Sequence, residues 1–252
     1  MLKSDKEITV WAHRGFNKNA PENTLSAFIK ALTAGESLKN NASVNNLGIE
    51  LDVCFSYDGR IVVIHDDSVD RTTDGTGAVS DLTYSELRLL DAGSWFGREF
   101  ADERIPLLEE VLLFVGDSFY INIELKHSGF RENPEESLEF KVDRLLRKLD
   151  MCNNILISSF NWNMLERYRR LNKTVKMGIL LDNGWPAEKG LRMAERVTAF
   201  SVHPEISDFL NNPEIFSNSD FAVYPWTVKN SETAEQVLDF GADGYFADLP
   251  FS

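Results

Sequence analysis

Cysteine is scarce in this sequence, which contains only Cys54 and Cys152, far apart along the chain. Two isolated cysteines exclude a disulfide framework, and no Cys-x-x-Cys pair is present for zinc binding or redox chemistry. We expect both residues to be buried thiols in a protein of a reducing compartment.

Long hydrophobic runs are absent as well. No stretch of about 18 consecutive apolar residues occurs, so no transmembrane helix is predicted. The first seven residues, Met1 to Glu7, lack the apolar core of a secretory signal peptide. We therefore expect a cytoplasmic protein without stable membrane insertion.

Positive charge is in short supply, with 26 Lys and Arg against 40 Asp and Glu and a net charge of −14. Such an acidic chain is repelled by phosphate backbones and anionic membrane surfaces, so nucleic acid is not an expected partner.

The chain has enough apolar residues to build a sizeable hydrophobic core, with 43% hydrophobic residues and 17 Phe. We expect residues 1–252 to form a single domain. No sequence feature specifies an oligomeric state.

Short apolar runs alternate with segments of helical periodicity, which predicts a parallel sheet. Eight strand–helix units in about 250 residues is the size of a TIM (β/α)8 barrel. The alternative is an open doubly wound sheet, but no GxGxxG or P-loop motif follows the first strand. The predicted strands are 8–12, 48–53, 120–126, 155–158, 176–181, 199–202, 221–226 and 244–247. The predicted helices are 22–34, 107–115, 135–149, 161–171, 187–196, 206–216 and 231–240, with Gly35 ending the first and 36–46 forming a loop.

The stretch from Gly48 to His65 organises the rest of the chain. Side chains alternate along a strand, so Glu50 and Asp52 share one face and repel each other unless a cation lies between them. Oxygen ligands of this kind suit Mg²⁺ or Ca²⁺ better than zinc, and the alternative is a solvated strand face. The Asp58-Gly59 turn is too close to Val53 for a parallel crossover, so the next strand returns antiparallel. That return brings His65 to the level of Glu50 and Asp52.

Residues 66–104 have no clean strand period and are expected to form a small insertion after the second strand. A capping box of Thr83 and Glu86 predicts a short helix through Leu90. Three aromatic residues follow, and we interpret the segment as a lid or a pocket wall. These residues are Trp95, Phe96 and Phe100.

Polar residues fall at the ends of four predicted strands, which is where the active site of a TIM barrel lies. A hard cation held by Glu50, Asp52 and Glu124 would act as a Lewis acid on a phosphodiester. Arg14 offers forked donors to phosphate and Lys126 a point charge, while two histidines can share acid and base roles. The strand-end residues are His13, Arg14, Glu50, Asp52, Glu124, Lys126 and Trp226.

Several of these residues have a plainer explanation. Glu124 and Lys126 could form a simple ion pair at the barrel mouth, and Trp226 could serve packing alone. Glu22 could be an acid in the first turn of a helix, where the dipole favours it. Asp66 could orient His65, although neighbours in sequence often face apart. The two remaining histidines, His127 and His203, are expected on the surface or in loops.

The ordered set of motifs resembles the glycerophosphodiester phosphodiesterase family over nearly the whole chain. One departure is visible, because the segment from Gly35 to Leu47 is longer than the usual link and rich in Asn. The motifs are His13-Arg14-Gly15, Pro21-Glu22-Asn23-Thr24, Glu50-Leu51-Asp52-Val53, Asp58-Gly59, His65-Asp66, Arg71-Thr72-Thr73, Ile105-Pro106-Leu107, Glu124-Leu125-Lys126, Trp226-Thr227-Val228 and Gly241-Ala242-Asp243-Gly244.

The resemblance implies a TIM barrel with one divalent cation, Mg²⁺ or Ca²⁺, on the three carboxylates. It implies His13 and His65 as the acid–base pair, with Arg14 and Lys126 on the phosphate. Members of the family hydrolyse glycerophosphodiesters to an alcohol and glycerol 3-phosphate. In a route similar to that of phosphatidylinositol-specific phospholipases C, the glycerol 2-hydroxyl attacks phosphorus and water opens the cyclic phosphate. We expect His13 to act as base and His65 as acid in the first step.

Two other functions stay open at this point. A lysophospholipase D would need an apolar ramp at the site mouth, which the three aromatic residues of the insertion could supply. A phosphoester-binding module without catalysis would have lost a histidine or a carboxylate, and this sequence retains all of them.

Overall fold

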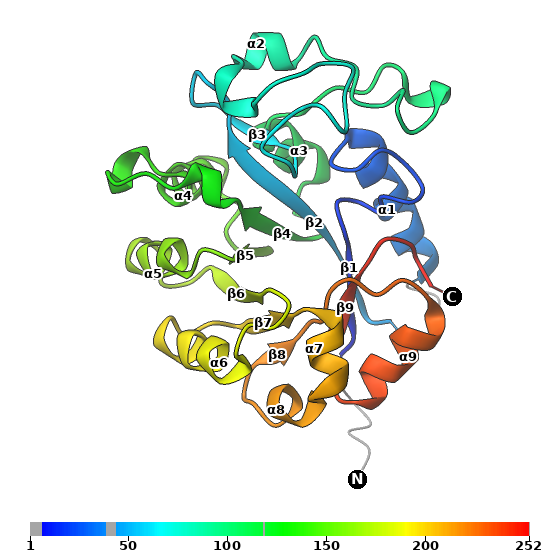
Figure 1. Ribbon diagram of the computed structural model, residues 1–252, viewed down its shortest axis with the longest axis vertical. Helices are drawn as coiled ribbons and strands as arrows, with labels where there is room; N and C mark the ends of the chain where they lie inside the picture. The colour runs from blue at the N-terminus through cyan, green and yellow to red at the C-terminus, as the bar shows by residue number, and fades with distance from the viewer. Residues whose placement is uncertain (1–6, 39–43, 118, 252) are drawn as a thin grey trace.

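The structure, a computed structural model, describes residues 7–38, 44–117 and 119–251. Within these residues, eight parallel strands form a barrel in the order β8-β7-β6-β5-β4-β2-β1-β9 (Figure 1). The ends nearly close, since Phe246 N donates to Pro225 O at 3.0 Å. The predicted TIM barrel is thus confirmed, and the structure is not the alternative open doubly wound sheet. The strands are β1 (Thr9–Ala12), β2 (Asn46–Phe55), β4 (Tyr120–Leu125), β5 (Ile155–Ser159), β6 (Lys176–Leu181), β7 (Ser201–Pro204), β8 (Ala222–Val223) and β9 (Gly244–Ala247).

Helices surround the barrel (Figure 1). Leu112, Val142 and Leu165, from three successive helices, are fully buried in one core with the strand residues. None of the helices in the described ranges is long and apolar enough to cross a membrane. They are α1 (Leu25–Leu38), α2 (Tyr84–Leu87), α3 (Leu108–Val115), α4 (Leu138–Leu149), α5 (Trp162–Leu171), α6 (Ala187–Arg196), α7 (Ile206–Asn211), α8 (Pro213–Ser217) and α9 (Ser231–Asp239).

The first helix differs from its prediction at both ends. It starts at Leu25 rather than residue 22, because Asn23 has a left-handed φ of 59° that interrupts a helix there. It continues through Gly35, which was expected to end it. A Cβ at Gly35 would lie 2.8 Å from Leu47 Cδ2, so this glycine permits close packing of helix on strand. Of the predicted loop 36–46, residues 39–43 lie outside the described residues.

Later elements also differ from their predicted boundaries. The predicted helix 206–216 is split into α7 and α8, with Pro213 at the first position of the second helix, where its missing N–H costs nothing. The predicted strands 199–202 and 221–226 become Ser201–Pro204 and the two-residue β8. Of the two cysteines, Cys54 is buried as expected, whereas Cys152 is partly exposed.

The hairpin after β2 has the predicted antiparallel form. Strand β3 (Ile61–Val63) pairs with β2 so that Val63 lies opposite Val53. The antiparallel hydrogen bonding continues one residue beyond β3, because Ile64 N donates to Asp52 O at 3.1 Å. His65 consequently comes back to the level of Leu51, between Glu50 and Asp52.

The insertion of residues 66–104 packs on the outer face of this hairpin, at one edge of the barrel (Figure 1). It has its own small hydrophobic core, in which Val69, Val79 and Leu87 pack with Cys54 and Val62 of the hairpin. The predicted capping box of α2 is present, although the helix ends at Leu87 rather than Leu90. The insertion is therefore anchored by apolar contacts as well as by the charged contacts described below.

Candidate active site

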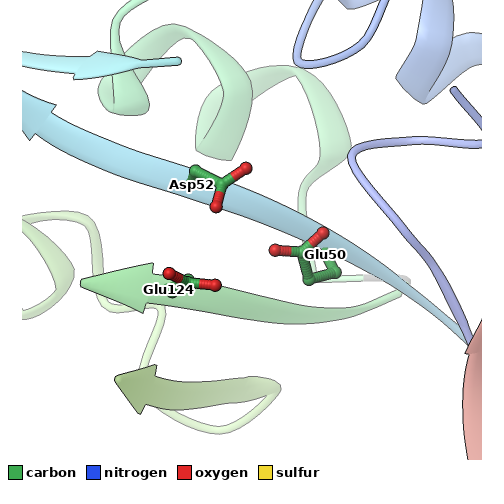
Figure 2. Close-up of side chains that lie close together, drawn as sticks. All are labelled: Glu50, Asp52 and Glu124. Atoms are coloured by element: carbon green, nitrogen blue, oxygen red, sulfur yellow. The ribbon is translucent and has the colours of Figure 1, made fainter. Parts of the chain in front are cut away.

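Three buried carboxylates gather inside the carboxyl end of the barrel (Figure 2). Glu50 and Asp52 project from the same face of β2, as their spacing predicted, and Glu124 projects from β4. Parallel pairing of the two strands places Asp52 opposite Glu124. One oxygen from each side chain lies within 4.8 Å of the others, and the three residues are 3%, 1% and 8% exposed.

Crowding of these carboxylates perturbs each of them. Burial, followed by the charges of Asp52 and Glu124, raises the pKa of Glu50 well above its usual value. Burial and Asp52 raise the pKa of Glu124 to about 7, against the opposing effect of Lys126. Burial also disfavours ionised Asp52, but Arg14 and Lys126 outweigh it and hold the pKa of Asp52 below its usual value. If all three carboxylates were ionised without a cation, the cluster would therefore carry more negative charge than its neighbours compensate.

A divalent cation fits this cluster. The donor set consists of carboxylate oxygens, which hard cations such as Mg²⁺ and Ca²⁺ prefer. Oxygens on opposite sides of a Ca²⁺ ion, each about 2.4 Å from it, are about 4.8 Å apart. The oxygens of Glu50, Asp52 and Glu124 already lie within that separation.

The two predicted phosphate-binding cations lie against the carboxylates. Arg14, at a left-handed φ of 53°, donates its backbone N–H to Glu50 Oε2 at 2.7 Å, and its Nε lies 3.5 Å from Asp52 Oδ2. Lys126 Nζ donates to Glu124 Oε1 at 3.0 Å and lies 3.7 Å from Asp52 Oδ1. The ion pair of Glu124 and Lys126 is thus one part of a larger charged cluster.

Both predicted catalytic histidines are held by an aspartate through Nδ1. The distance from His13 Nδ1 to Asp248 Oδ1 is 2.7 Å, and from His65 Nδ1 to Asp66 Oδ1 it is 2.6 Å. Burial works against ionised Asp248, yet its hydrogen bond to His13 lowers its pKa, and the pKa of Asp66 is lowered to about 2. Ionised carboxylates only accept, so each Nδ1 carries a proton and Nε2 is left for chemistry.

The environment of His65 favours its neutral form. Burial is the largest cause of its lowered pKa, and the charges of Arg14 and Lys126 act in the same direction against Asp52. The predicted link between His65 and Asp66 is confirmed. Asp248, in contrast, was not singled out from the sequence, although it directly follows the last barrel strand, where site residues of this fold are found.

A cavity of about 50 Å³ lies among these groups. Its polar side contains both histidines, Arg14, Glu50 and Glu124, and its apolar side is formed by Phe160, Leu180 and Trp226. Trp226 is held by its Nε1, which donates to His203 O at 2.9 Å, and by an edge-on contact with Phe160. Two larger hollows elsewhere, of about 220 and 740 Å³, are lined by none of the predicted site residues.

Three secondary expectations have different outcomes. His127 is exposed, as expected, and contacts Asn161 Nδ2 at 2.9 Å. His203 was expected on the surface and is fully buried on β7, where burial lowers its pKa to about 3 and Ser201 Oγ lies 2.7 Å from Nε2. Glu22 was expected in the first turn of a helix, but it precedes α1 and accepts a hydrogen bond from Arg14 Nη1 at 2.8 Å.

One further neighbour of the carboxylates was missed. Asn23, at its left-handed φ, donates Nδ2 to Asp52 Oδ2 at 2.9 Å and accepts the N–H of Asp52 through Oδ1 at 3.3 Å. This pair of hydrogen bonds fixes Asp52 on its strand. The Pro-Glu-Asn-Thr motif is the sequence feature that could have indicated this residue, because asparagine tolerates the left-handed conformation.

Comparison with known proteins agrees with this geometry. Residues 13–251 match the glycerophosphoryl diester phosphodiesterase family. A glycerophosphodiester phosphodiesterase of Caldanaerobacter subterraneus subsp. tengcongensis is 39% identical over 245 residues, covering 96% of this chain and 94% of that protein. A glycerophosphodiester phosphodiesterase of Bacillus altitudinis is 37% identical over 247 residues, covering 96% and 94%.

A solved structure is similar as well. The phosphodiesterase of Oleispira antarctica, in complex with the product sn-glycerol-3-phosphate, has a TM-score of 0.79 at 30% identity and covers 96% of this chain and 93% of its own. The chain therefore belongs to the glycerophosphoryl diester phosphodiesterase family and is an enzyme that hydrolyses phosphoric diester bonds.

Proposed function

We propose that the enzyme uses one divalent cation and two histidines to hydrolyse glycerophosphodiesters to an alcohol and glycerol 3-phosphate. The observation that carries this proposal is the cluster of three buried carboxylates, two of which, Glu50 and Glu124, line the same cavity as both histidines. The names of the relatives support the substrate class, and the Oleispira antarctica complex with sn-glycerol-3-phosphate supports the product.

Glu50, Asp52 and Glu124 are the proposed ligands of the cation, either Mg²⁺ or Ca²⁺. When bound, the cation supplies Lewis acidity toward a phosphate oxygen. Arg14 and Lys126 contribute on the protein side. Their charges remain in place when substrate arrives, and they can offer donors to the remaining phosphate oxygens because neither side chain is fully enclosed, with 16% and 17% exposure.

The two histidines would then move protons in two steps. In the first step, His13 Nε2 takes the proton of the glycerol 2-hydroxyl as its oxygen bonds to phosphorus. The bond from phosphorus to the alcohol oxygen breaks, and His65 Nε2 gives that oxygen a proton. In the second step, the roles reverse: His65 takes a proton from water as the water oxygen bonds to phosphorus, the bond from phosphorus to the 2-oxygen breaks, and His13 returns a proton to the 2-oxygen. Asp248 and Asp66 keep both rings oriented throughout.

In the free enzyme, the lowered pKa of His65 disfavours the protonated form that the first step requires as acid, so substrate binding must favour that form. A phosphodiester anion beside Arg14 and Lys126 offsets the two charges that lower the pKa of His65. Trp226, with Phe160 and Leu180, is the proposed apolar contact for the carbon atoms of the substrate. This wall is small, which suits a glycerol unit.

The two other functions are less well supported. The aromatic residues of the insertion, which a lysophospholipase D would use as an apolar ramp, are not among the described residues that line the cavity. A binding module without catalysis would not need both histidines to be oriented by aspartates.

The test is the dependence of turnover on metal and on head group. Enzyme treated with EDTA should lose activity toward glycerophosphocholine, and Mg²⁺ or Ca²⁺ should restore it. A panel of choline, ethanolamine and inositol diesters should show cleavage of more than one substrate. Full activity in EDTA would contradict the role of the carboxylate cluster, and preference for long-chain lysolipids would favour the lysophospholipase D.

A further inference from the structure

Arg71 of the insertion lies between two carboxylates that come from different parts of the chain. Its Nε donates to Asp66 Oδ2 at 2.6 Å and its Nη2 to Asp66 Oδ1 at 3.1 Å. On the other side, Nη1 donates to Glu22 Oε2 and Nη2 to Glu22 Oε1, both at 2.8 Å. A single guanidinium therefore makes two forked pairs, an arrangement that only the planar donor set of arginine allows.

The first of these pairs leads to a catalytic histidine. Asp66 is the partner of His65 Nδ1 at 2.6 Å, and its side chain is 29% exposed. Without Arg71, Asp66 Oδ2 would lose the hydrogen bond that holds it, and the carboxylate could rotate toward solvent. The hydrogen bond from Arg71 is the largest cause of the lowered pKa of Asp66. Arg71 thus favours the ionised form of Asp66 and, through two hydrogen bonds, fixes its orientation.

The second pair leads to the phosphate-binding side of the site. Glu22 also accepts from Arg14 Nη1 at 2.8 Å, and Arg14 Nε lies 3.5 Å from Asp52. Glu22 is 9% exposed and bonded to both arginines. Burial raises its pKa, but Arg71 and Arg14 outweigh burial and keep it ionised. The contacts form a continuous chain: His65, Asp66, Arg71, Glu22, Arg14, Asp52.

We propose that Arg71 is a positioning residue, which sets the place of His65 relative to Arg14 and thereby to the phosphorus of the substrate. The inference rests on the proposed function, in which His65 is the acid and Arg14 binds the phosphate. It assigns no chemistry to Arg71 itself. It gives the Arg71-Thr72-Thr73 motif a role, and it explains why an insertion outside the barrel belongs to the working site.

A purely structural role for Arg71 is less consistent with its surroundings. The insertion is anchored by its own apolar core, which includes Val69, Val79 and Leu87. The side chain of Arg71 is 45% exposed, and exposed ion pairs contribute little to folding. The loss of Arg71 should therefore affect the geometry of the site more than the stability of the protein.

The experiment compares Arg71→Gln with Arg88→Gln in the full chain. Arg88 lies in the same insertion and is similarly exposed at 41%, but its ion pair is with Glu110. We expect kcat of Arg71→Gln to fall by about 10- to 100-fold, since misplacing a reacting group by about 1 Å costs about 100-fold. KM and the melting temperature should stay close to wild type. Arg88→Gln should keep its kcat.

A double-mutant cycle shows whether Arg71 acts through Asp66. If it does, Asp66→Asn with Arg71→Gln should be little worse than Asp66→Asn alone, and Arg71→Lys should retain part of the activity. Wild-type kcat in Arg71→Gln, or fully multiplicative losses in the double variant, would overturn the inference. His65→Ala separates the two proposals: if it keeps near-wild-type turnover, the proposed function fails, whereas an inactive His65→Ala beside a fully active Arg71→Gln contradicts only the role of Arg71.

Discussion

Asp52 and Glu124 stand opposite each other in the parallel register of β2 and β4, with their carboxylates in one buried cluster. Paired strands are held about 4.8 Å apart by their hydrogen bonds, so the two acids cannot separate without breaking the sheet. The fold therefore enforces repulsion between carboxylates at this place. A cation relieves that repulsion, and several predictions depend on this relationship.

Removing one carboxylate should weaken cation binding. We expect Glu124→Gln to lower the affinity for Mg²⁺ or Ca²⁺ by about tenfold or more, because one of three charged oxygen ligands is lost. Isothermal titration calorimetry on protein stripped with EDTA measures this directly. Glu109→Gln is the matched control, since Glu109 is a surface acid paired with Lys148. Equal affinities in Glu124→Gln and wild type would remove Glu124 from the ligand set.

The stability of the cation-free protein should fall as the pH rises from 6.5 to about 8. The pKa of Glu124 is about 7 in the folded protein, against an ordinary value of 4.5, and the pKa of Glu50 is raised as well. In this interval the folded protein holds protons that the unfolded chain has already released, so rising pH lowers the free energy of unfolding. His203 and His65, whose pKa values are lowered by burial, have the opposite effect, which fades as the pH rises above their ordinary pKa of 6.5.

Thermal unfolding in EDTA at several pH values checks this dependence. Saturating cation should abolish it, because ligated carboxylates are already deprotonated, and Glu124→Gln should flatten it without cation. A melting temperature that rises over the same interval in EDTA would contradict the raised pKa values of Glu124 and Glu50.

Loss of either proposed catalytic histidine should leave a folded but slow enzyme. We expect His13→Ala and His65→Ala each to reduce turnover by about 100-fold or more, the contribution typical of general acid–base catalysis. His127→Ala is the control, because His127 is exposed and is not among the cavity residues. Steady-state kinetics with a melting curve for each variant separate catalysis from folding. A variant that turns over like wild type would exclude its histidine from the mechanism.

Local patterns in the sequence predicted a large part of this site. The two-residue spacing of Glu50 and Asp52 is enough to place both on one strand face, and the short link after Val53 is enough to return His65 to their level. These inferences need only the geometry of a strand and the length of a turn. The barrel followed from the alternation of strands and helices in the same way.

Contacts between distant segments could not be predicted like this. Asp248 is 235 positions from His13, and Glu22 is 49 from Arg71, so both pairs depend on how the barrel closes and how the insertion folds back. The prediction for His203 was wrong because the predicted strand ended at residue 202, whereas β7 extends to Pro204. A shift of strand boundary changes which residues face the interior, and local sequence fixes such boundaries poorly.

The measurement that tests the central claim most directly is ³¹P NMR of glycerophosphocholine turnover by the cation-loaded enzyme. We expect the diester signal to be replaced by that of glycerol 3-phosphate, with a transient cyclic phosphate, and we expect EDTA to stop the reaction. Appearance of phosphocholine instead would mean that the other ester bond is cleaved. Undiminished turnover in EDTA would show that the buried carboxylates do not serve a metal-dependent reaction.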